Sequence, residues 1–207
     1  GKARQDPPVA APPGKGRWRL RCGRDSAIWS GMGQFFIARR RVEFSETDMA
    51  RVVHFSNFFR YVEHAEARLF EELGGMLIGQ TAEGLVGWPR VRASCSYHAP
   101  LFFGDEVEIR LGVREIKVKA VEFVFTLHRL AGGQSSKVAR GEMTTCRVVR
   151  PVGAPAEVMD STAVPEELVA GLERYLIKRR PAGFDGGGDS APGGGSPSPR
   201  REDAGRS

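Results

Sequence analysis

The chain has 207 residues, an ordinary apolar fraction of 41% and a formal net charge of +6. This length supports one domain with a core of useful size, and the composition excludes a fibrous or fully unstructured chain. The positive charge would suit a nucleic-acid partner only if it lay on the folded part.

Most of that charge lies near the N-terminus. Residues 1–34 hold seven Lys and Arg against two Asp, and residues 181–207 hold three Arg against four acidic residues. The first segment lacks hydrophobic periodicity and the last is rich in Gly, Ser and Pro. We therefore predict a disordered basic leader over 1–34, one domain over 35–180 and a disordered tail over 181–207. Met32 is a hypothetical natural start, which N-terminal sequencing would test.

The three cysteines lack the spacing of a metal-binding or redox motif, and no apolar run reaches the roughly 20 residues of a membrane span. We therefore expect a cytoplasmic protein with no disulfide framework, no metal site and no membrane partner.

In chain order, the first predicted element is a strand over residues 35–44, where β-forming residues end in alternation. A helix over 57–73 follows, because apolar residues recur there at steps of three and four. Ser56 or Asn57 can cap its start, and two glycines after Leu73 end it.

Residues 76–88 carry three glycines and are predicted to form a loop. Strand-like runs separated by short turns follow, at residues 90–98, 106–115, 121–130 and 137–149. A short helix from Pro165 to about Ile177 closes the folded region. One long helix followed by long strands is typical of an antiparallel sheet wrapped on that helix, an α+β fold without βαβ units.

Asp48 precedes the long helix, in a position where capping or turn formation is the common role. Seven residues later, the amides around Phe55 and Ser56 begin a helix whose unpaired N–H groups and positive dipole end suit a developing oxyanion. We therefore predict that these amides polarise a carbonyl group while Asp48 attacks it or activates water.

Two glutamates of the helix need separate interpretations. On a helical wheel Glu66 falls inside the apolar arc, so its carboxylate must be paired or functional, since burying it alone is costly. An interface ion pair and an active-site role are both open. Glu63 lies at the edge of the arc, where a salt bridge is favoured.

His54 has a ring that can orient a substrate or shuttle a proton, but its apolar neighbours favour a packed side chain. His64 falls on the solvated face of the helix. The sequence has no His/Cys cluster, no G-x-S-x-G motif and no nucleotide-binding glycine motif, which argues against a metal centre, an α/β serine hydrolase and the usual nucleotide folds.

Three basic residues, Arg114, Lys117 and Lys119, bracket a turn between predicted strands. Each one alone suits a solvated turn. Together with Arg90 they would hold the phosphates of an anionic substrate by charge-assisted hydrogen bonds.

Two stretches resemble the 4-hydroxybenzoyl-CoA thioesterase family of hotdog-fold acyl-CoA thioesterases: E-F-S-E-T-D-M-A-R-V-V-H-F-S-N-F-F-R-Y-V-E-H-A and W-P-R-V-R-A-S-C-S-Y-H-A-P-L-F-F-G-D-E-V-E-I-R. The resemblance runs from about Phe35 to Arg150. It implies a hotdog fold, a homodimer joined through the sheet or a homotetramer, and hydrolysis of an acyl-CoA thioester with no cofactor.

By this resemblance, Asp48 is the catalytic carboxylate, the Phe55 amide polarises the carbonyl, and Glu63 is the helix glutamate common in the family. Asn57 matches the family's Asn at the helix start. Arg51 is a departure, because the family usually has Gly there. If that Gly serves a positive φ or a close approach of substrate, Arg51 costs strain or narrows the pocket.

Phe58, Phe59 and Trp88 are expected to help line an acyl pocket at the dimer interface. The predicted catalytic residues are Asp48, the Phe55 amide, Glu66 and Glu63. The predicted substrate-binding residues are His54, Asn57, Arg51, Phe58, Phe59, Trp88, Arg90, Arg114, Lys117 and Lys119.

Three alternatives remain. A non-catalytic hotdog protein that binds acyl-CoA or acyl carrier protein is favoured by Arg51. An enoyl-CoA hydratase would need an Asn-Pro pair that D-M-A-R-V-V-H lacks. Nucleic-acid binding through residues 1–34 predicts an affinity that is lost when they are deleted and weakened by salt.

Overall fold

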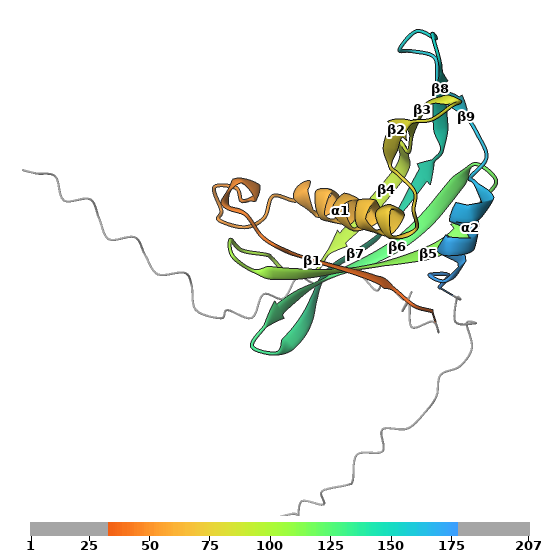
Figure 1. Ribbon diagram of the computed structural model, residues 1–207. Coiled ribbons are helices and arrows are strands. Elements are labelled where there is room, and N and C mark those ends of the chain that lie inside the picture. Colours follow the sequence, from red (N-terminus) through yellow and green to blue (C-terminus); the bar gives the residue numbers. More distant parts are fainter. Residues whose placement is uncertain (1–32, 178–207) are drawn as a thin grey trace, which may run out of the picture.

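The computed structural model describes residues 33–177, so the predicted leader, except for its last two residues, and the predicted tail lie outside the described part. A five-stranded antiparallel sheet has the strand order β1-β5-β6-β7-β4. Its strands are β1 (Phe36–Arg41), β5 (Glu106–Ile116), β6 (Ala120–Ala131), β7 (Gln134–Cys146) and β4 (Arg90–Tyr97). The long helix α1 (Asn57–Glu72) lies across one face of this sheet (Figure 1). The predicted α+β layout is confirmed.

Helix α1 forms where the apolar stripe predicted it. Its buried apolar face includes Tyr61, Val62, Ala65 and Leu69, each fully buried. Full burial of a side chain the size of leucine contributes about 1.5–3 kcal/mol. The helix ends before Gly74, which adopts a positive φ of 72° as C-terminal glycines commonly do.

The first predicted strand was too long at its C-terminal end. Strand β1 stops at Arg41, and a short 3-10 helix, η1 (Phe44–Glu46), takes over. The carboxylate of Glu46 accepts a hydrogen bond from the Glu43 amide at 2.8 Å and closes this turn. The chain is thereby redirected from the sheet towards the start of α1.

A second, small antiparallel sheet occupies part of the region predicted as a loop. Its order is β2-β3-β8-β9, formed by β2 (Ile78–Gln80), β3 (Gly84–Gly87), β8 (Val148–Pro151) and β9 (Asp160–Ser161). The loop prediction for 76–88 was therefore wrong in part, and the predicted strand 137–149 is two strands broken at Arg147. Figure 1 shows this sheet projecting beyond the end of α1.

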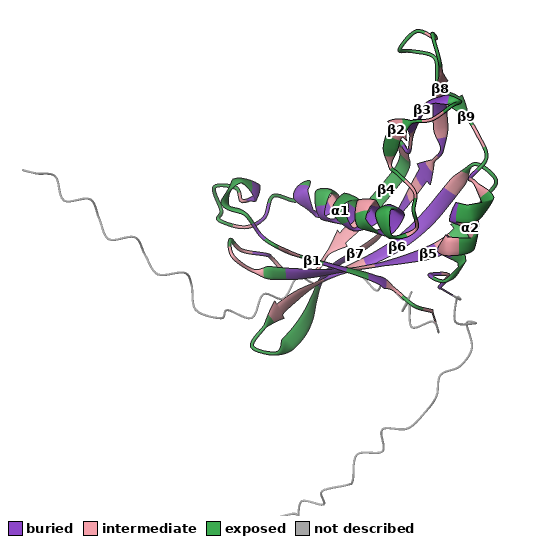
Figure 2. Ribbon diagram, in the orientation of Figure 1, coloured by how far each residue is buried: buried purple, intermediate pink, exposed green. Residues whose placement is uncertain are grey.

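The core lies between α1 and the main sheet. Figure 2 shows buried residues concentrated on β5 and β6, whereas the tip of the β6–β7 hairpin is exposed. Helix α2 (Glu166–Glu173) closes the core beside β5 through the buried Leu168 and Leu172. The chain after α2 was predicted as helix to about Ile177, but Leu176 instead forms a parallel bridge with Val113 of β5.

Candidate active site

Asp48 sits in a tight turn between two bridged residues, Thr47 and Val53. The Arg51 amide donates to the Asp48 carbonyl at 2.9 Å, and the Asp48 amide donates to the Val52 carbonyl at 2.9 Å. One carboxylate oxygen of Asp48 accepts the Ala50 amide at 2.8 Å. No residue within 33–177 donates a hydrogen bond to its other oxygen, and the side chain is exposed. The carboxylate is thus oriented by the turn and open to a substrate.

The backbone conformation at Arg51 is one that favours glycine, the residue expected at this position. It has φ of 62°, and between residues 33 and 177 it is the only residue other than glycine with a positive φ. A four-residue turn followed by one left-handed residue is a common hairpin connection, and glycine suits the last place because it lacks Cβ. A left-handed residue other than glycine costs about 1–2 kcal/mol. Of the two reasons considered for a glycine at this position, the structure shows the first, a positive φ.

The amide of Phe55 is available as a donor. No acceptor for it exists among the described residues, while the Phe55 carbonyl accepts the Tyr97 hydroxyl at 3.2 Å. Ser56 occupies the N-cap position but makes no side-chain cap; its hydroxyl is hydrogen-bonded to the His54 ring at 2.8 Å. The Phe55 amide is therefore unpaired near the positive end of the α1 dipole, whereas the Ser56 and Asn57 amides donate to the ring and the carbonyl of His54.

His54 and Asn57 both differ from simple expectations. The prediction of a packed His54 was wrong, since the side chain is exposed and its ring lies 4.4 Å from the Phe55 ring. Asn57 is buried, and its side-chain amide donates to the Glu46 carbonyl at 2.7 Å. Asn57 thus ties the Asp48 turn to the helix start, whereas the His54 ring is exposed and bonded to Ser56.

Glu46 and Tyr97 belong to this region although no role was predicted for them. The Glu46 carboxylate is 7% exposed and accepts hydrogen bonds from Arg40 at 2.5 Å and from Tyr61 at 2.8 Å. The sequence signal was weak because Tyr61 lies fifteen residues from Glu46, and no local spacing relates a turn carboxylate to such partners. Tyr97 comes from an edge strand whose place beside α1 follows only from sheet order.

Glu66 and Glu63 share one partner, Arg90 at the start of β4. Glu66 is fully buried and accepts a hydrogen bond from Arg90, which also lies 3.3 Å from the exposed Glu63. Burial raises the pKa of Glu66 to about 7, although Arg90 favours the charged form. Glu63 lies about two turns along the helix from Phe55, and Glu66 about three turns. Their geometry is that of an ion pair joining α1 to the sheet.

The aromatic residues predicted to line an acyl pocket lie near opposite ends of α1 in a single chain. Phe58 is buried against Tyr97, with ring centroids 5.0 Å apart, and Phe59 is half-buried beside the core. Trp88 packs on Phe70 with centroids 4.9 Å apart, near the opposite end of α1. Only the two phenylalanines lie near the helix start in a single chain.

The predicted phosphate-binding residues do not form one group. Arg90 lies towards the helix, whereas Arg114 and Lys117 pair with Glu122, whose neighbours along β6 face the core, so that these pairs occupy the opposite face of the sheet. Lys119 has no acidic partner in the described residues and donates to the Ser161 hydroxyl at 3.3 Å. Arg114 and Lys117 have their charge compensated.

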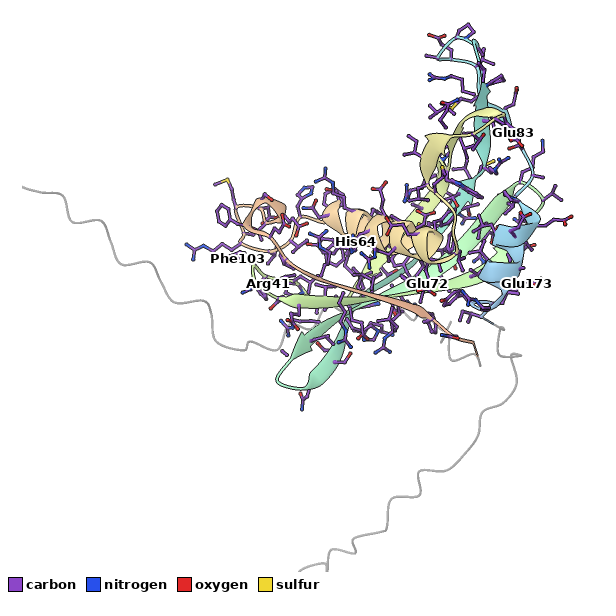
Figure 3. The ribbon with its side chains drawn as sticks, in the orientation of Figure 1. Arg41, His64, Glu72, Glu83, Phe103 and Glu173 are labelled. Carbon is purple, nitrogen blue, oxygen red and sulfur yellow. The ribbon has the colours of Figure 1, made fainter. Side chains whose placement is uncertain are left out.

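A hollow of about 650 Å³ opens at the end of β1, beside η1. It is lined by Arg40, Arg41, Val42, Glu43, Phe44, His64 and Phe103. The rings of Phe44 and Phe103 meet edge to face at 6.1 Å and are largely exposed. Figure 3 shows Arg41 and Phe103 at this end of the molecule, while Glu72 and Glu173 lie at the other.

Residues 33–177 hold neither a candidate metal site nor a helix that could span a membrane. Three or more metal-binding side chains do not gather anywhere in that part of the chain, and none of its helices is long and apolar enough to cross a membrane.

Comparison with known proteins identifies the family. A family model described as the thioesterase-like superfamily matches residues 42–172. A putative esterase from Aquifex aeolicus is 34% identical over 127 residues, which are 60% of this chain and 95% of the relative. A 1,4-dihydroxy-2-naphthoyl-CoA hydrolase from Nostoc punctiforme is 27% identical over 139 residues, which are 67% of this chain and 86% of the relative.

A solved structure supports the fold. The 4-hydroxybenzoyl-CoA thioesterase from Pseudomonas sp. strain CBS-3 superposes with a TM-score of 0.57 at 19% identity, covering 67% of this chain and 99% of the other. The family match spans more than half of the chain. The chain therefore belongs to the thioesterase-like superfamily, and the predicted hotdog fold and thioester-hydrolase class are confirmed.

Proposed function

We propose that this protein hydrolyses the thioester of an acyl-CoA to the free acid and CoA, with Asp48 and the Phe55 amide as its reactive groups. One observation carries the proposal. The exposed carboxylate of Asp48 and the unpaired amide of Phe55 belong to one short segment of the chain. The bridge between Thr47 and Val53 closes its turn, and the buried Asn57 side chain ties it to the helix start. A thioesterase needs two such groups: one that attacks the thioester carbon or activates water, and one that donates a hydrogen bond to the oxyanion.

Two reaction routes are compatible with this site, and both begin with the thioester carbonyl placed between Asp48 and the Phe55 amide. Asp48 attacks the thioester carbon directly, forming a mixed anhydride that water then hydrolyses, or it takes a proton from a water that attacks. In both routes the carbonyl oxygen becomes an oxyanion that accepts the Phe55 N–H, and collapse of the tetrahedral intermediate expels the CoA thiolate. The dipole of α1 stabilises the same negative charge.

The substrate proposal combines the site with the relatives. A named relative acts on 1,4-dihydroxy-2-naphthoyl-CoA, so we place aromatic acyl-CoAs first among candidates. Phe58 and Phe59 of one chain would line the acyl group, with Trp88 contributed across a dimer interface. His54 and Arg51, both exposed beside Asp48, would contact the polar part of the substrate.

The CoA phosphates need cations whose charge is not already compensated. Lys119 meets this condition, because among the described residues its ammonium group contacts only a serine hydroxyl. Arg114 and Lys117 are held by Glu122, and Arg90 by Glu66. We therefore assign phosphate binding to Lys119 first, and Arg90, Arg114 and Lys117 would take part only by exchanging their acidic partners for phosphate.

A homodimer joined through β4 is part of the proposal. Strand β4 is the edge of the main sheet, its residues Val91 to Ser94 are exposed, and β7 is its single neighbour in that sheet. Such an edge pairs readily with a second copy. The second copy would also cover the exposed Asp48 turn. The cytoplasmic location stays a prediction.

A panel of aliphatic and aromatic acyl-CoAs tests the proposed function, with release of the CoA thiol as the measurement. We expect turnover of at least one aromatic ester. Tight binding of acyl-CoA without thiol release would instead establish the non-catalytic binding protein, which Arg51 favours because its side chain stands where a family glycine leaves space.

A further inference from the structure

The turn that carries Asp48 is held from one side by a single buried carboxylate, that of Glu46. One of its oxygens accepts Arg40 of β1 at 2.5 Å. The other accepts the Tyr61 hydroxyl of α1 and the Glu43 amide of the turn before η1, both at 2.8 Å. The carboxylate therefore joins the sheet, the helix and the connecting loop two residues before Asp48.

The backbone of Glu46 adds two further contacts. Its carbonyl accepts the His54 amide at 2.9 Å and the Asn57 side-chain amide at 2.7 Å. His54 immediately precedes Phe55, and Asn57 is the first residue of α1. One residue thus fixes the chain on both sides of the turn, before Asp48 through its side chain and before Phe55 through its carbonyl.

The partners of Glu46 are themselves rigid. Tyr61 is fully buried, and the Arg40 guanidinium lies over its ring at 4.3 Å from the centroid. Burial and the neighbouring carboxylate raise the pKa of Tyr61, so its hydroxyl keeps its proton and remains a donor at neutral pH. Charge-assisted hydrogen bonds in a buried site are shorter and stronger than neutral ones. Among the described residues, no exposed acid competes with Glu46 for the guanidinium of Arg40.

We propose that Glu46 is a positioning residue that holds the Asp48 carboxylate at working distance from the Phe55 amide, without touching the substrate itself. The proposal rests on the proposed function. Misplacing a catalytic group by about 1 Å can lower a rate about 100-fold even when the group itself is intact. Loss of Glu46 should therefore act on the chemical step rather than on binding.

The test compares Glu46→Ala with Glu108→Ala in the full chain. Glu108 is a matched control, since it is equally buried at 5% exposure and is held by Arg39 and Arg110 on the opposite face of the sheet. We expect both variants to lose stability in urea, but only Glu46→Ala to lower kcat by about 10–100-fold with KM within about threefold. Glu46→Gln keeps acceptors for Tyr61 and should recover part of the rate.

A double variant separates positioning from stability. In an Asp48→Asn background, Glu46→Ala should lower the residual rate by a smaller factor than in the wild-type background, because the carboxylate that Glu46 positions is gone, while the loss in urea stays the same. An equal factor in both backgrounds, or a kcat loss shared by Glu108→Ala, would overturn the proposal.

Hydrogen exchange gives a readout that does not need activity. In Glu46→Ala, and to a lesser degree in Glu46→Gln, amide exchange should rise more over residues 47–57 than in β6, where it should rise only by the factor expected from the loss of global stability. Unchanged exchange over 47–57 refutes the positioning role. A wild-type protein that turns over no acyl-CoA removes the proposed function instead, so the two failures are distinguishable.

Discussion

At the scale of single residues, Arg51 shows how a side chain can be retained against backbone strain. Its positive φ places Cβ in the left-handed region, where glycine is the unstrained choice. Strain of this kind concentrates near functional sites. Arg51 is three residues from Asp48, so its exposed guanidinium lies next to the reacting group of the proposed mechanism.

Replacing Arg51 by glycine should stabilise the fold. We expect Arg51→Gly to raise the free energy of unfolding by up to about 1 kcal/mol, because the relief of strain exceeds the extra chain entropy of glycine. Urea denaturation measures this. Arg51→Ala is the control, since it removes the guanidinium but keeps Cβ and should give no such gain. Equal stability of the two variants would show that the backbone at this position is not strained.

Glu66 gives a second residue-scale prediction, based on pH. Its pKa is raised from 4.5 to about 7 in the folded protein, chiefly by burial. The folded state therefore holds a proton that the unfolded state releases, and this stabilisation, fully present below pH 4.5, is lost as pH rises towards 7.

Glu66→Gln mimics the protonated carboxyl at every pH. We expect the stability of the wild type to fall relative to this variant by on the order of 3 kcal/mol between pH 4.5 and pH 8. Urea denaturation of both proteins across that range is the measurement. A constant difference across the pH range would mean that Glu66 titrates normally.

At the scale of elements, the start of α1 unites the candidate site. The Phe55 amide has no acceptor in the described part of the chain, and the Tyr97 hydroxyl from the edge strand donates to the carbonyl of the same residue. In the proposed mechanism the start of the helix therefore contributes a backbone group, and side-chain substitution alone does not remove it.

Phe55→Pro removes that N–H while leaving the helix start intact, since proline is tolerated ahead of a helix. We expect kcat on an acyl-CoA ester to fall by about 10²–10³-fold, the usual loss for one oxyanion donor. Phe55→Ala keeps the amide and should retain most of the rate, with helix content checked by circular dichroism. Similar rates for both variants would exclude the amide.

The elements that could be predicted are those whose information is local. The stripe over 57–73 predicted α1 because its burial pattern repeats within one segment. The three- and four-residue strands β2 and β3 could not be recognised in 76–88, because β3 is completed by β8, more than sixty residues later. The site divides in the same way: Asp48 and Phe55 are neighbours along the chain, whereas Glu46 depends on Arg40 and Tyr61 from two other elements.

At the scale of the whole molecule, the main sheet has two edge strands, β1 and β4. Strand β4 exposes Val91 and Ala93. At the opposite edge, β1 pairs with β5, and Leu176 forms a bridge to Val113 of β5 beyond the end of β1. The proposed dimer would extend the sheet across the β4 edge and bring Trp88 of one copy towards the site of the other.

Charges on the edge should separate such a dimer. We expect Val91→Lys/Ala93→Lys to convert a dimer into a monomer in analytical ultracentrifugation and to lower turnover at least about tenfold, because like charges meet across a two-fold edge. Val152→Lys, at an exposed turn residue away from β4, is the control. An unchanged sedimentation coefficient for the edge variant would place the interface elsewhere.

The central claim is that Asp48 performs the chemistry, and the rate of thiol release from one acyl-CoA by wild type and by Asp48→Asn tests it most directly. The substitution keeps the side chain's size and leaves an oxygen for the Ala50 amide, so the fold should not change. We predict a loss in kcat of at least about 100-fold, as expected for a nucleophile or general base. Equal turnover by the two proteins would contradict the account.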